Sequence, residues 1–257
     1  MIKIIKGTTD SALTEAQTLL RKEEFREMSN WGSFPEKMLI TFRSLLSQHA
    51  STYDELCFFD VGAAEGCYTC EALKHHDKVT VFSFEPEIPR MEVLQENILK
   101  VAKDNNKEKK KVNVNLYQLL VGDGKEKTQL LRLYEAPETG GGGGSSTTIL
   151  FERHDRKSID IPCKTVSLND FVDKCSKVDV IKIDVEGAEL NVLNGAEKFL
   201  EKFKPFIFLE VHNGCQFGSV TIKQVKKIVK KCNIDYQYKL IEKHGSLEYY
   251  LLYCDKG

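Results

Sequence analysis

A segment of acids and glycines near residue 60 has the spacing of a cofactor loop. Its sequence is Asp60-Val61-Gly62-Ala63-Ala64-Glu65-Gly66, and it closes the apolar run CFFDVG, which is typical of a buried parallel strand. Gly62 and Gly66 allow the backbone to turn tightly and approach a ligand, and the amide groups of the next helix then point outward. We therefore expect a cofactor to contact Asp60, Gly62, Ala63, Glu65 and Gly66.

The spacing of the glycines separates two classes of cofactor. A dinucleotide fingerprint has the pattern G-x-G-x-x-G and places a pyrophosphate at the helix N-terminus. The segment here has the pattern D-x-G-x-x-x-G, with acids at Asp60 and Glu65. Those charges would repel a pyrophosphate, but they suit the ammonium group of a methionyl moiety. The pattern therefore favours S-adenosylmethionine over a nicotinamide cofactor.

A second acid stands where a nucleoside would need it. Glu85 follows Gly66 by 19 residues, ends the strand VTVFSFEP and precedes Pro86. An acid at this position accepts hydrogen bonds from a ribose diol, which nicotinamide cofactors and S-adenosylmethionine both carry. Glu85 thus indicates a nucleoside without choosing between them. Val121, at the end of VNVNLYQLLV, is a weaker candidate for contacts to an adenine edge.

Further polar residues follow the next two strands. Asp184 ends the strand VDVIKID, and Glu186 follows in the turn before the next helix. Glu210 and His212 lie two residues apart in PFIFLEVH, so they share a face. A histidine beside several acids is a candidate general base near neutral pH, although a purely structural hydrogen bond is the alternative. We assign catalytic roles to His212, Asp184 and Glu186, and we expect Asp184 to contact the cofactor as well.

Metal binding is the minor hypothesis for these acids. Asp184 could hold a divalent ion with Glu186 or Glu210, but oxygen-rich clusters are also ordinary cofactor contacts. We predict no metal site. Of the eight cysteines only Cys67 and Cys70 have the C-x-x-C spacing, and a zinc ribbon would need a second such pair. We expect reduced thiols that serve packing.

Alternating strands and helices must position these residues. Strand patterns end near Asp60, Glu85, Val121, Asp184 and His212. Helical periodicity follows all of these strands except the third, and includes Leu190–Phe203 and Thr221–Cys232. Such alternation predicts a doubly wound α/β fold with a mostly parallel sheet of seven strands. The segments YQYKLIEK and LEYYLLYC flank His244-Gly245-Ser246 and predict an antiparallel hairpin at the C-terminus.

Two regions depart from the alternation. Residues 1–53 are predicted to form a helical appendage, with one helix over 10–29 and another after Pro35 that buries Met38 and Phe42. Residues 54–257 form the main domain, with an insertion at 124–176 whose outer parts resemble strands and a short helix. The glycine run 140–144 inside it predicts either a connector or a loop near the substrate.

Composition excludes some classes of protein. The net charge of −1 provides no field that would attract nucleic acid or an anionic membrane. The sequence contains no apolar run of the roughly 20 residues that span a bilayer, and the N-terminus is not typical of a signal peptide. We therefore expect a cytoplasmic protein that has no membrane partner. We do not favour nucleic acid as a partner.

Together the motifs resemble the FkbM-type methyltransferase family. The resemblance runs from FFDVGAAEGCYT through FSFEP, VSLNDFV and VDVIKIDVEGAELNVLNGA to PFIFLEVH. It implies a class I methyltransferase fold and transfer of a methyl group from S-adenosylmethionine, typically to a hydroxyl of a sugar or natural product. It also implies cofactor roles for Asp60, Gly62, Glu65, Gly66, Glu85 and Asp184.

The predicted function is O-methylation of a sugar, glycan or small natural product that depends on S-adenosylmethionine. Two alternatives remain. A nucleic-acid (RNA) methyltransferase would share the fold, and the helix TIKQVKKIVKKC offers it a basic surface. The apolar residues of this helix fit burial on the sheet, however, so we favour a solvated outer face for these lysines. A non-catalytic protein that binds S-adenosylmethionine is the other. The sequence does not identify the acceptor or the oligomeric state.

Overall fold

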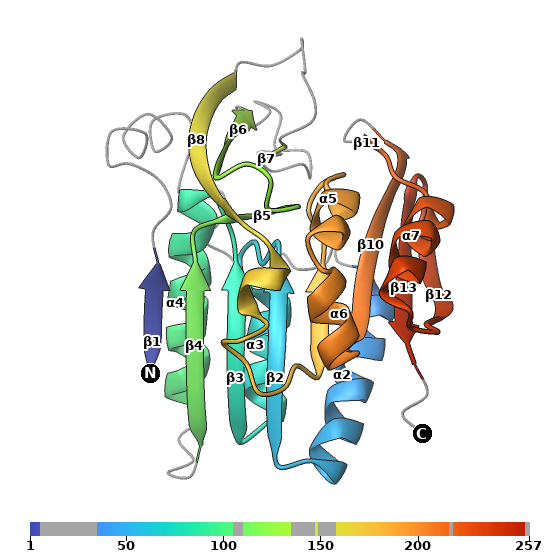
Figure 1. The fold of residues 1–257 in the computed structure, drawn as a ribbon. Coiled ribbons are helices and arrows are strands. Elements are labelled where there is room, and N and C mark those ends of the chain that lie inside the picture. Colours follow the sequence, from blue (N-terminus) through green and yellow to red (C-terminus); the bar gives the residue numbers. More distant parts are fainter. Residues whose placement is uncertain (6–34, 105–109, 135–146, 149–157, 216–217, 255–257) are drawn as a thin grey trace.

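The computed structural model describes residues 1–5, 35–104, 110–134, 147–148, 158–215 and 218–254. These residues form a three-layer α/β arrangement with a second, smaller sheet over one edge (Figure 1). No helix in the described ranges combines the length and the apolar character needed to cross a membrane.

The main sheet is mostly parallel, as predicted. Its strands run in the order β1-β4-β3-β2-β9-β10-β13-β12, and neighbours from β1 to β10 pair in parallel. The C-terminal hairpin of β12 and β13 is confirmed and pairs antiparallel with β10. The bounds are β1 (Ile2–Ile5), β2 (Glu55–Val61), β3 (Lys78–Phe84), β4 (Lys111–Tyr117), β9 (Val180–Ile183), β10 (Phe206–Cys215), β12 (Gln237–His244) and β13 (Leu247–Tyr253).

Helices cover both faces of this sheet (Figure 1). One face carries α2 (Glu36–Thr52), α3 (Cys67–His75) and α4 (Ile88–Asp104). The other carries η3 (Leu168–Phe171), α5 (Glu189–Asn194), α6 (Glu197–Phe203), α7 (Ile222–Val229) and η4 (Lys230–Cys232). The doubly wound class is therefore confirmed.

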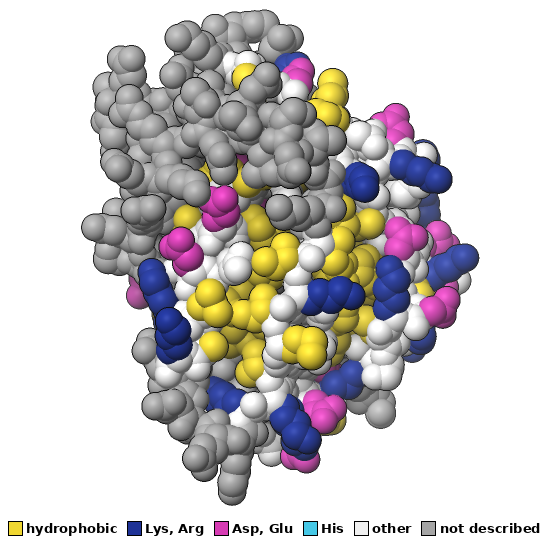
Figure 2. Space-filling model, turned by 90° about the vertical axis from the view of Figure 1, so that its left-hand side faces the viewer, with side chains coloured by type: hydrophobic (Ala, Val, Ile, Leu, Met, Phe, Trp, Pro, Cys, Tyr) yellow, Lys and Arg dark blue, Asp and Glu magenta, His cyan; other side chains and the backbone are white. Residues whose placement is uncertain are grey.

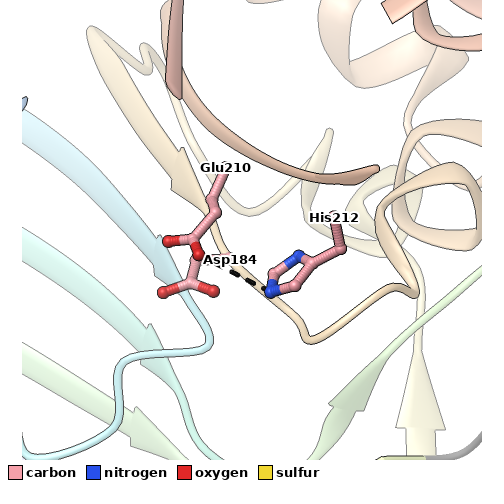
Figure 3. A group of neighbouring side chains, drawn as sticks. All are labelled: Asp184, Glu210 and His212. Carbon is pink, nitrogen blue, oxygen red and sulfur yellow. Dashed lines mark ion pairs between the residues drawn. The ribbon is translucent and has the colours of Figure 1, made fainter. Parts of the chain in front are cut away.

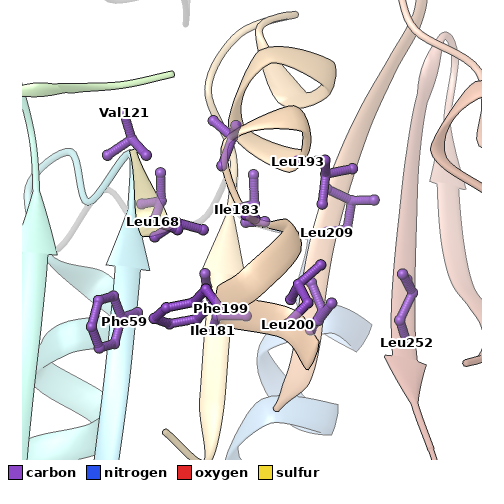
Figure 4. Packing of buried hydrophobic residues seen from close by; sticks show 14 of the residues in the cluster. Phe59, Val121, Leu168, Ile181, Ile183, Leu193, Phe199, Leu200, Leu209 and Leu252 are labelled. Atoms are coloured by element: carbon purple, nitrogen blue, oxygen red, sulfur yellow. The ribbon is translucent and has the colours of Figure 1, made fainter. Parts of the chain in front are cut away.

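The core on the second face is built from aromatic and branched side chains. Phe59 of β2 packs edge-on against Phe171 and Phe199, with ring centroids 5.7 and 5.0 Å apart. Ile181 and Ile183 of β9 lie beside them and are fully buried (Figure 4). Because both faces of β2 and β9 are covered, these strands consist almost entirely of buried residues, which explains their continuous apolar runs.

The N-terminal region differs from the predicted helical appendage. Residues 2–5 form the strand β1, which pairs with β4 at the edge and adds an eighth strand to the main path. The helix predicted at 10–29 lies outside the described residues. The second helix is present as α2, and its buried Met38, Phe42 and Leu46 share one core cluster with Phe58 and Phe208.

The insertion contributes a small sheet of its own. Leu120 and Val121 do not continue β4; they form β5, which pairs with β8 in the order β5-β8-β6-β7. The predicted strand 112–121 is therefore wrong in its last residues. The bounds are β5 (Leu120–Val121), β6 (Thr128–Tyr134), β7 (Thr147–Thr148) and β8 (Ser158–Val166), and the glycine run 140–144 lies outside the described part. A further strand, β11 (Gly218–Ser219), pairs with β10.

The helix predicted over Leu190–Phe203 is broken at Gly195. A Cβ atom there would lie 2.1 Å from the carbonyl oxygen of Gly122, so only glycine lets the chain pass this close to the end of β5. The chain therefore ends α5 at Asn194 and starts α6 at Glu197.

Two further features concern the cysteines of α3 and the edge strand β1. Cys67 and Cys70 are free and buried in α3, and burial raises the pKa of each thiol to about 12, which agrees with a packing role. Figure 2 looks at the side of the molecule that carries the edge strand β1 and shows hydrophobic side chains gathered in the middle of this face. Ile4 of β1 is 39% exposed.

Candidate active site

A cleft opens at the carboxyl edge of the main sheet, where β2, β3 and β9 end beside the small sheet. Its lining includes six residues that the sequence predicted: Gly62, Glu85, Pro86, Val121, Asp184 and Glu186. The small sheet contributes Leu120 and Leu131. Strand ends from distant parts of the sequence thus meet at one site, as expected for an open α/β sheet.

Gly62 is required by the neighbouring strand. Its φ is 77°, and a Cβ atom would lie 1.7 Å from the carbonyl oxygen of Asp184. The amide of Gly62 donates to the carbonyl of Phe84 over 2.9 Å. The loop after β2 is therefore pressed between β3 and β9, and a side chain at position 62 would push Asp184 away.

Glu85 fixes the same loop from the end of β3. One of its carboxylate oxygens accepts from the amide of Ala64 at 2.8 Å and the other from the amide of Glu87 at 2.9 Å. Ala64 has a φ of 47°, an unfavourable value for a residue with a side chain, and the bond to Glu85 helps to hold it. Burial raises the pKa of Glu85, which is 4% exposed and lies on the cleft wall.

Asp60 was expected to contact the cofactor, but its side chain does not line the cleft. It is fully buried, and one of its carboxylate oxygens accepts from the amide and the hydroxyl of Thr69 at 3.1 and 2.7 Å. Its other oxygen lies 3.7 Å from the Nζ atom of Lys182. Asp60 thus anchors α3 to β2 behind the cofactor loop, because the pleat of β2 turns its side chain toward that helix.

Three more predicted residues support the loop from behind. Ala63 is buried, with its amide bonded to the carbonyl of Phe84. Gly66 begins α3 with a φ of 88°, and a Cβ atom there would lie 2.2 Å from Leu94. The carboxylate of Glu65 is 3.9 Å from Arg90. None of the three, nor Asp60, is among the described residues that line the cleft.

His212 lies beside the cleft among carboxylates. Its Nδ1 atom is 2.8 Å from Glu189, and its Nε2 atom is 3.3 Å from Glu186 and 3.5 Å from Glu210. Figure 3 shows Asp184, Glu210 and His212 pointing toward one another from β10 and the end of β9. His212 is 1% exposed, so its ring is almost entirely sheltered from solvent, whereas the side chain of Glu186 is 35% exposed.

The surroundings of His212 bear on the general-base role predicted for it. Burial disfavours a charged imidazole, but hydrogen bonds to Glu186 and Glu189 outweigh it and raise the pKa of His212 to about 12. An imidazolium donates from both ring nitrogens and has no lone pair for another proton. These contacts favour the charged form of His212, and a charged ring cannot accept a proton from a substrate. Burial and the charge of Asp184 raise the pKa of Glu210 well above its usual value.

Comparison with known proteins identifies the family. Residues 60–239, well over half of the chain, match the family model described as the methyltransferase FkbM domain. The chain belongs to the FkbM methyltransferase family. Its cofactor is S-adenosylmethionine, which confirms the prediction made from the glycine spacing.

Solved structures agree with the fold of an FkbM chain. The methyltransferase FkbM from Methylobacillus flagellatus KT is 15% identical with a TM-score of 0.52, and the match covers 95% of this chain and 58% of that one. Magnesium protoporphyrin IX methyltransferase from Synechocystis PCC 6803, with bound SAM, is 8% identical with a TM-score of 0.51, over 98% and 100% of the two chains. These identities support the fold alone. A search of curated protein sequences finds no match.

One group in the FkbM chain has the residue types of a metal site. Donor atoms of Asp184, Glu210 and His212 all lie within 4.8 Å of one another. However, Asp184 is already 3.2 Å from the ammonium of Lys182, and both nitrogens of His212 face carboxylates. A metal ion would have to displace a proton from His212. The donor set therefore fits an internal ion network better than a metal centre.

Sequence reasoning missed two basic residues at the site. Arg90 lines the cleft and pairs with Glu87 at 2.9 Å. Lys182 is 5% exposed and approaches both Asp60 and Asp184. A lysine inside the otherwise apolar run VIKI of β9 is the signal that could have found it, since a buried charge needs a partner.

Proposed function

We propose that this FkbM chain transfers the methyl group of S-adenosylmethionine to a hydroxyl of a sugar, glycan or small natural product. The observation that carries the proposal is one cleft that joins a nucleoside-type end to an acidic end. Glu85 and Pro86 form the first end, and Asp184 and Glu186, with Gly62 beside them, form the second. Bound there, S-adenosylmethionine would supply the electrophilic methyl group.

Different residues of the cleft are proposed to bind the nucleoside and the methionyl parts of the cofactor. Glu85 is proposed to accept hydrogen bonds from the ribose diol, with Pro86 and Val121 beside the nucleoside. Asp184 is proposed to contact the methionyl end, because it is the acid at the tip of β9 and 27% of its side chain is exposed. Positioning of the acceptor against the methyl group then accounts for much of the rate.

The acceptor hydroxyl must lose a proton as its oxygen forms the new bond to carbon. We assign that proton to Glu210, which lies beside the cleft 3.5 Å from His212 and whose pKa is raised well above its usual value by burial and by Asp184. His212 holds Glu210 and Glu186 in place as a cation. Glu186 faces the cleft, where it can orient the acceptor.

The charge of this site disfavours the RNA alternative. Among the described residues, the acids Asp184, Glu186, Glu189 and Glu210 outnumber the cations Lys182, His212 and Arg90, so negative charge is in excess next to the cleft. A phosphate backbone would be repelled there. In α7 the residues Val225 and Val229 are buried, which supports the solvated-face interpretation of its lysines.

Calorimetric titration with S-adenosylhomocysteine tests the proposal. Glu85→Gln should weaken binding by about 10- to 100-fold, as expected for the loss of a buried acceptor worth about 1–3 kcal/mol. Glu96→Gln, an exposed change on α4, is the control and should bind like the wild type. Screening of sugar and glycan acceptors for release of S-adenosylhomocysteine follows. Binding without turnover on any acceptor would favour the non-catalytic alternative, and no binding would refute both.

A further inference from the structure

Lys182 is the most deeply placed cation of the site. It lies in β9 directly opposite Asp60 of β2 and Phe208 of β10 in the strand register. Its side chain therefore points into the layer between the sheet and α3, where it is 5% exposed. Its neighbours in β9, Ile181 and Ile183, point to the opposite face.

Three polar groups converge on its ammonium. The Nζ atom donates to the carbonyl of Gly62 at 2.5 Å, and it lies 3.2 Å from Asp184 and 3.7 Å from Asp60. The ring of Tyr68 lies 5.5 Å away. Burial alone would lower the pKa of Lys182, but the carboxylates of Asp184 and Asp60 raise it above its usual value, so the group stays charged.

Stability does not explain this arrangement by itself. A buried ion pair roughly breaks even against an apolar pair of the same volume, because both charges lose their hydration. An apolar residue could occupy this position, since Val180 of the same strand is fully buried in the core cluster on the same face of the sheet. The charge is placed where it touches the two segments that form the acidic end of the cleft.

We infer that Lys182 is a positioning residue for methyl transfer, an inference that rests on the proposed function. Its ammonium ties the carbonyl of Gly62, in the cofactor loop, to the carboxylate of Asp184 at the end of β9. One oxygen of Asp184 is thereby engaged inside the protein, and the rest of the carboxylate is presented to the cleft in a fixed orientation. Lys182 also offsets the charges of Asp60 and Asp184, which would otherwise repel each other.

A purely structural role and a positioning role for Lys182 predict different behaviour of a Lys182 variant. If Lys182 only stabilised the fold, the folded fraction of a variant would bind the cofactor normally. A positioning residue sets the place of Gly62 and Asp184, so its loss weakens cofactor binding and lowers kcat even in folded protein. The acceptor KM should change much less, because Lys182 does not line the cleft.

The test compares Lys182→Met, Lys182→Arg and Lys177→Met. Methionine keeps the length of the side chain without its charge, and arginine keeps the charge. Lys177 is the matched control, since it also pairs with an aspartate, Asp179 at 3.0 Å, but at the opposite edge of the sheet. Each variant is titrated with S-adenosylhomocysteine by calorimetry, melted, and assayed on any acceptor that the wild type methylates.

Lys182→Met should weaken S-adenosylhomocysteine binding by about tenfold or more and lower kcat by about 100-fold. Lys182→Arg should recover part of the affinity, and Lys177→Met should stay within about twofold of the wild type. A folded Lys182→Met with normal affinity would overturn the inference, whereas failure of the wild type to bind would count against the proposed function. If Lys182→Met does not fold, Asp60→Asn/Lys182→Met removes the unpaired buried charge and provides the same comparison.

Discussion

The two edges of the main sheet each bury a histidine, and the two rings differ in charge. His212 at the carboxyl edge is 1% exposed, and its pKa is raised to about 12. His76, which follows α3 at the amino edge, is 2% exposed, and its pKa is lowered to about 4. Burial acts in the same direction on both. The partners of each ring therefore decide its charge.

At the carboxyl edge each nitrogen of His212 meets a glutamate. At the amino edge the Nε2 atom of His76 meets the Nδ1 atom of His49 at 3.1 Å, and the carboxylate of Asp179 lies 3.5 Å from the far side of His49. Asp179 also accepts from the amide of Cys57. The carboxyl edge thus holds several charged groups around a cleft. At the amino edge the carboxylate of Asp179 contacts both His49 and the backbone of β2, which is a structural arrangement.

The largest effect is expected from removal of the proposed proton acceptor. Glu210→Gln should lower kcat by about 100-fold or more while S-adenosylhomocysteine affinity changes little. In the wild type, kcat should rise with pH as Glu210 loses its proton, and this rise should be absent in the variant. Steady-state kinetics from pH 5.5 to 9 test both points. Glu248→Gln, on the neighbouring strand β13, is the control, and equal losses in the two variants would contradict the assignment.

The second prediction concerns the charge on His212. Because its pKa is higher in the folded than in the unfolded state, its contribution to stability is complete below about pH 6.5 and declines as pH rises toward 12. His212→Gln should therefore cost about 2–3 kcal/mol near pH 6 and less at pH 9. Urea unfolding at the two pH values measures this. A constant difference would mean that the ring is neutral, and would restore it as a candidate base.

The sequence was sufficient to locate the cleft because its walls lie at strand ends. Gly62, Glu85 and Asp184 each follow an apolar run, and parallel strands bring such ends to one edge. The orientation of Asp60 was not predictable in this way, since periodicity defines two faces but not which of them meets a ligand. The charge of His212 depends on Glu189, which an adjacent element supplies.

Strand β1 shows a similar limit in the fold. The four residues Ile2–Ile5 are too few for a recognisable pattern, and only pairing with β4 makes them a strand. Lys182 was overlooked because its contacts with Gly62 and Asp60 come from the segment around β2, which is distant in the sequence. Features that depend on local order were predictable, whereas those that depend on contacts between distant segments were not.

The third prediction addresses the other edge and a smaller effect. His76 has a lower pKa in the folded than in the unfolded state, so stability should fall as pH drops from about 6.5 to 4. His76→Gln should remove about 1 kcal/mol or more of this dependence and leave kcat unchanged. Melts at pH 4.5 and 7 test the first point and turnover tests the second. A large fall in kcat would end the view that this edge is purely structural.

The smallest effect is expected from removal of metal ions. The group of Asp184, Glu210 and His212 has metal-binding residue types, yet Lys182 and the proton on His212 already supply positive charge to it. A divalent ion would compete with both, so we expect EDTA to leave the rate of S-adenosylhomocysteine release within about twofold. Addition of Mg²⁺ or Mn²⁺ should give no gain at pH 7. His212→Gln sharpens the test, because it removes the imidazolium and opens the group to an ion without any proton to displace. A tenfold loss with EDTA that one metal restores in the wild type would show that the carboxyl edge balances its acids with a metal rather than with Lys182 and His212.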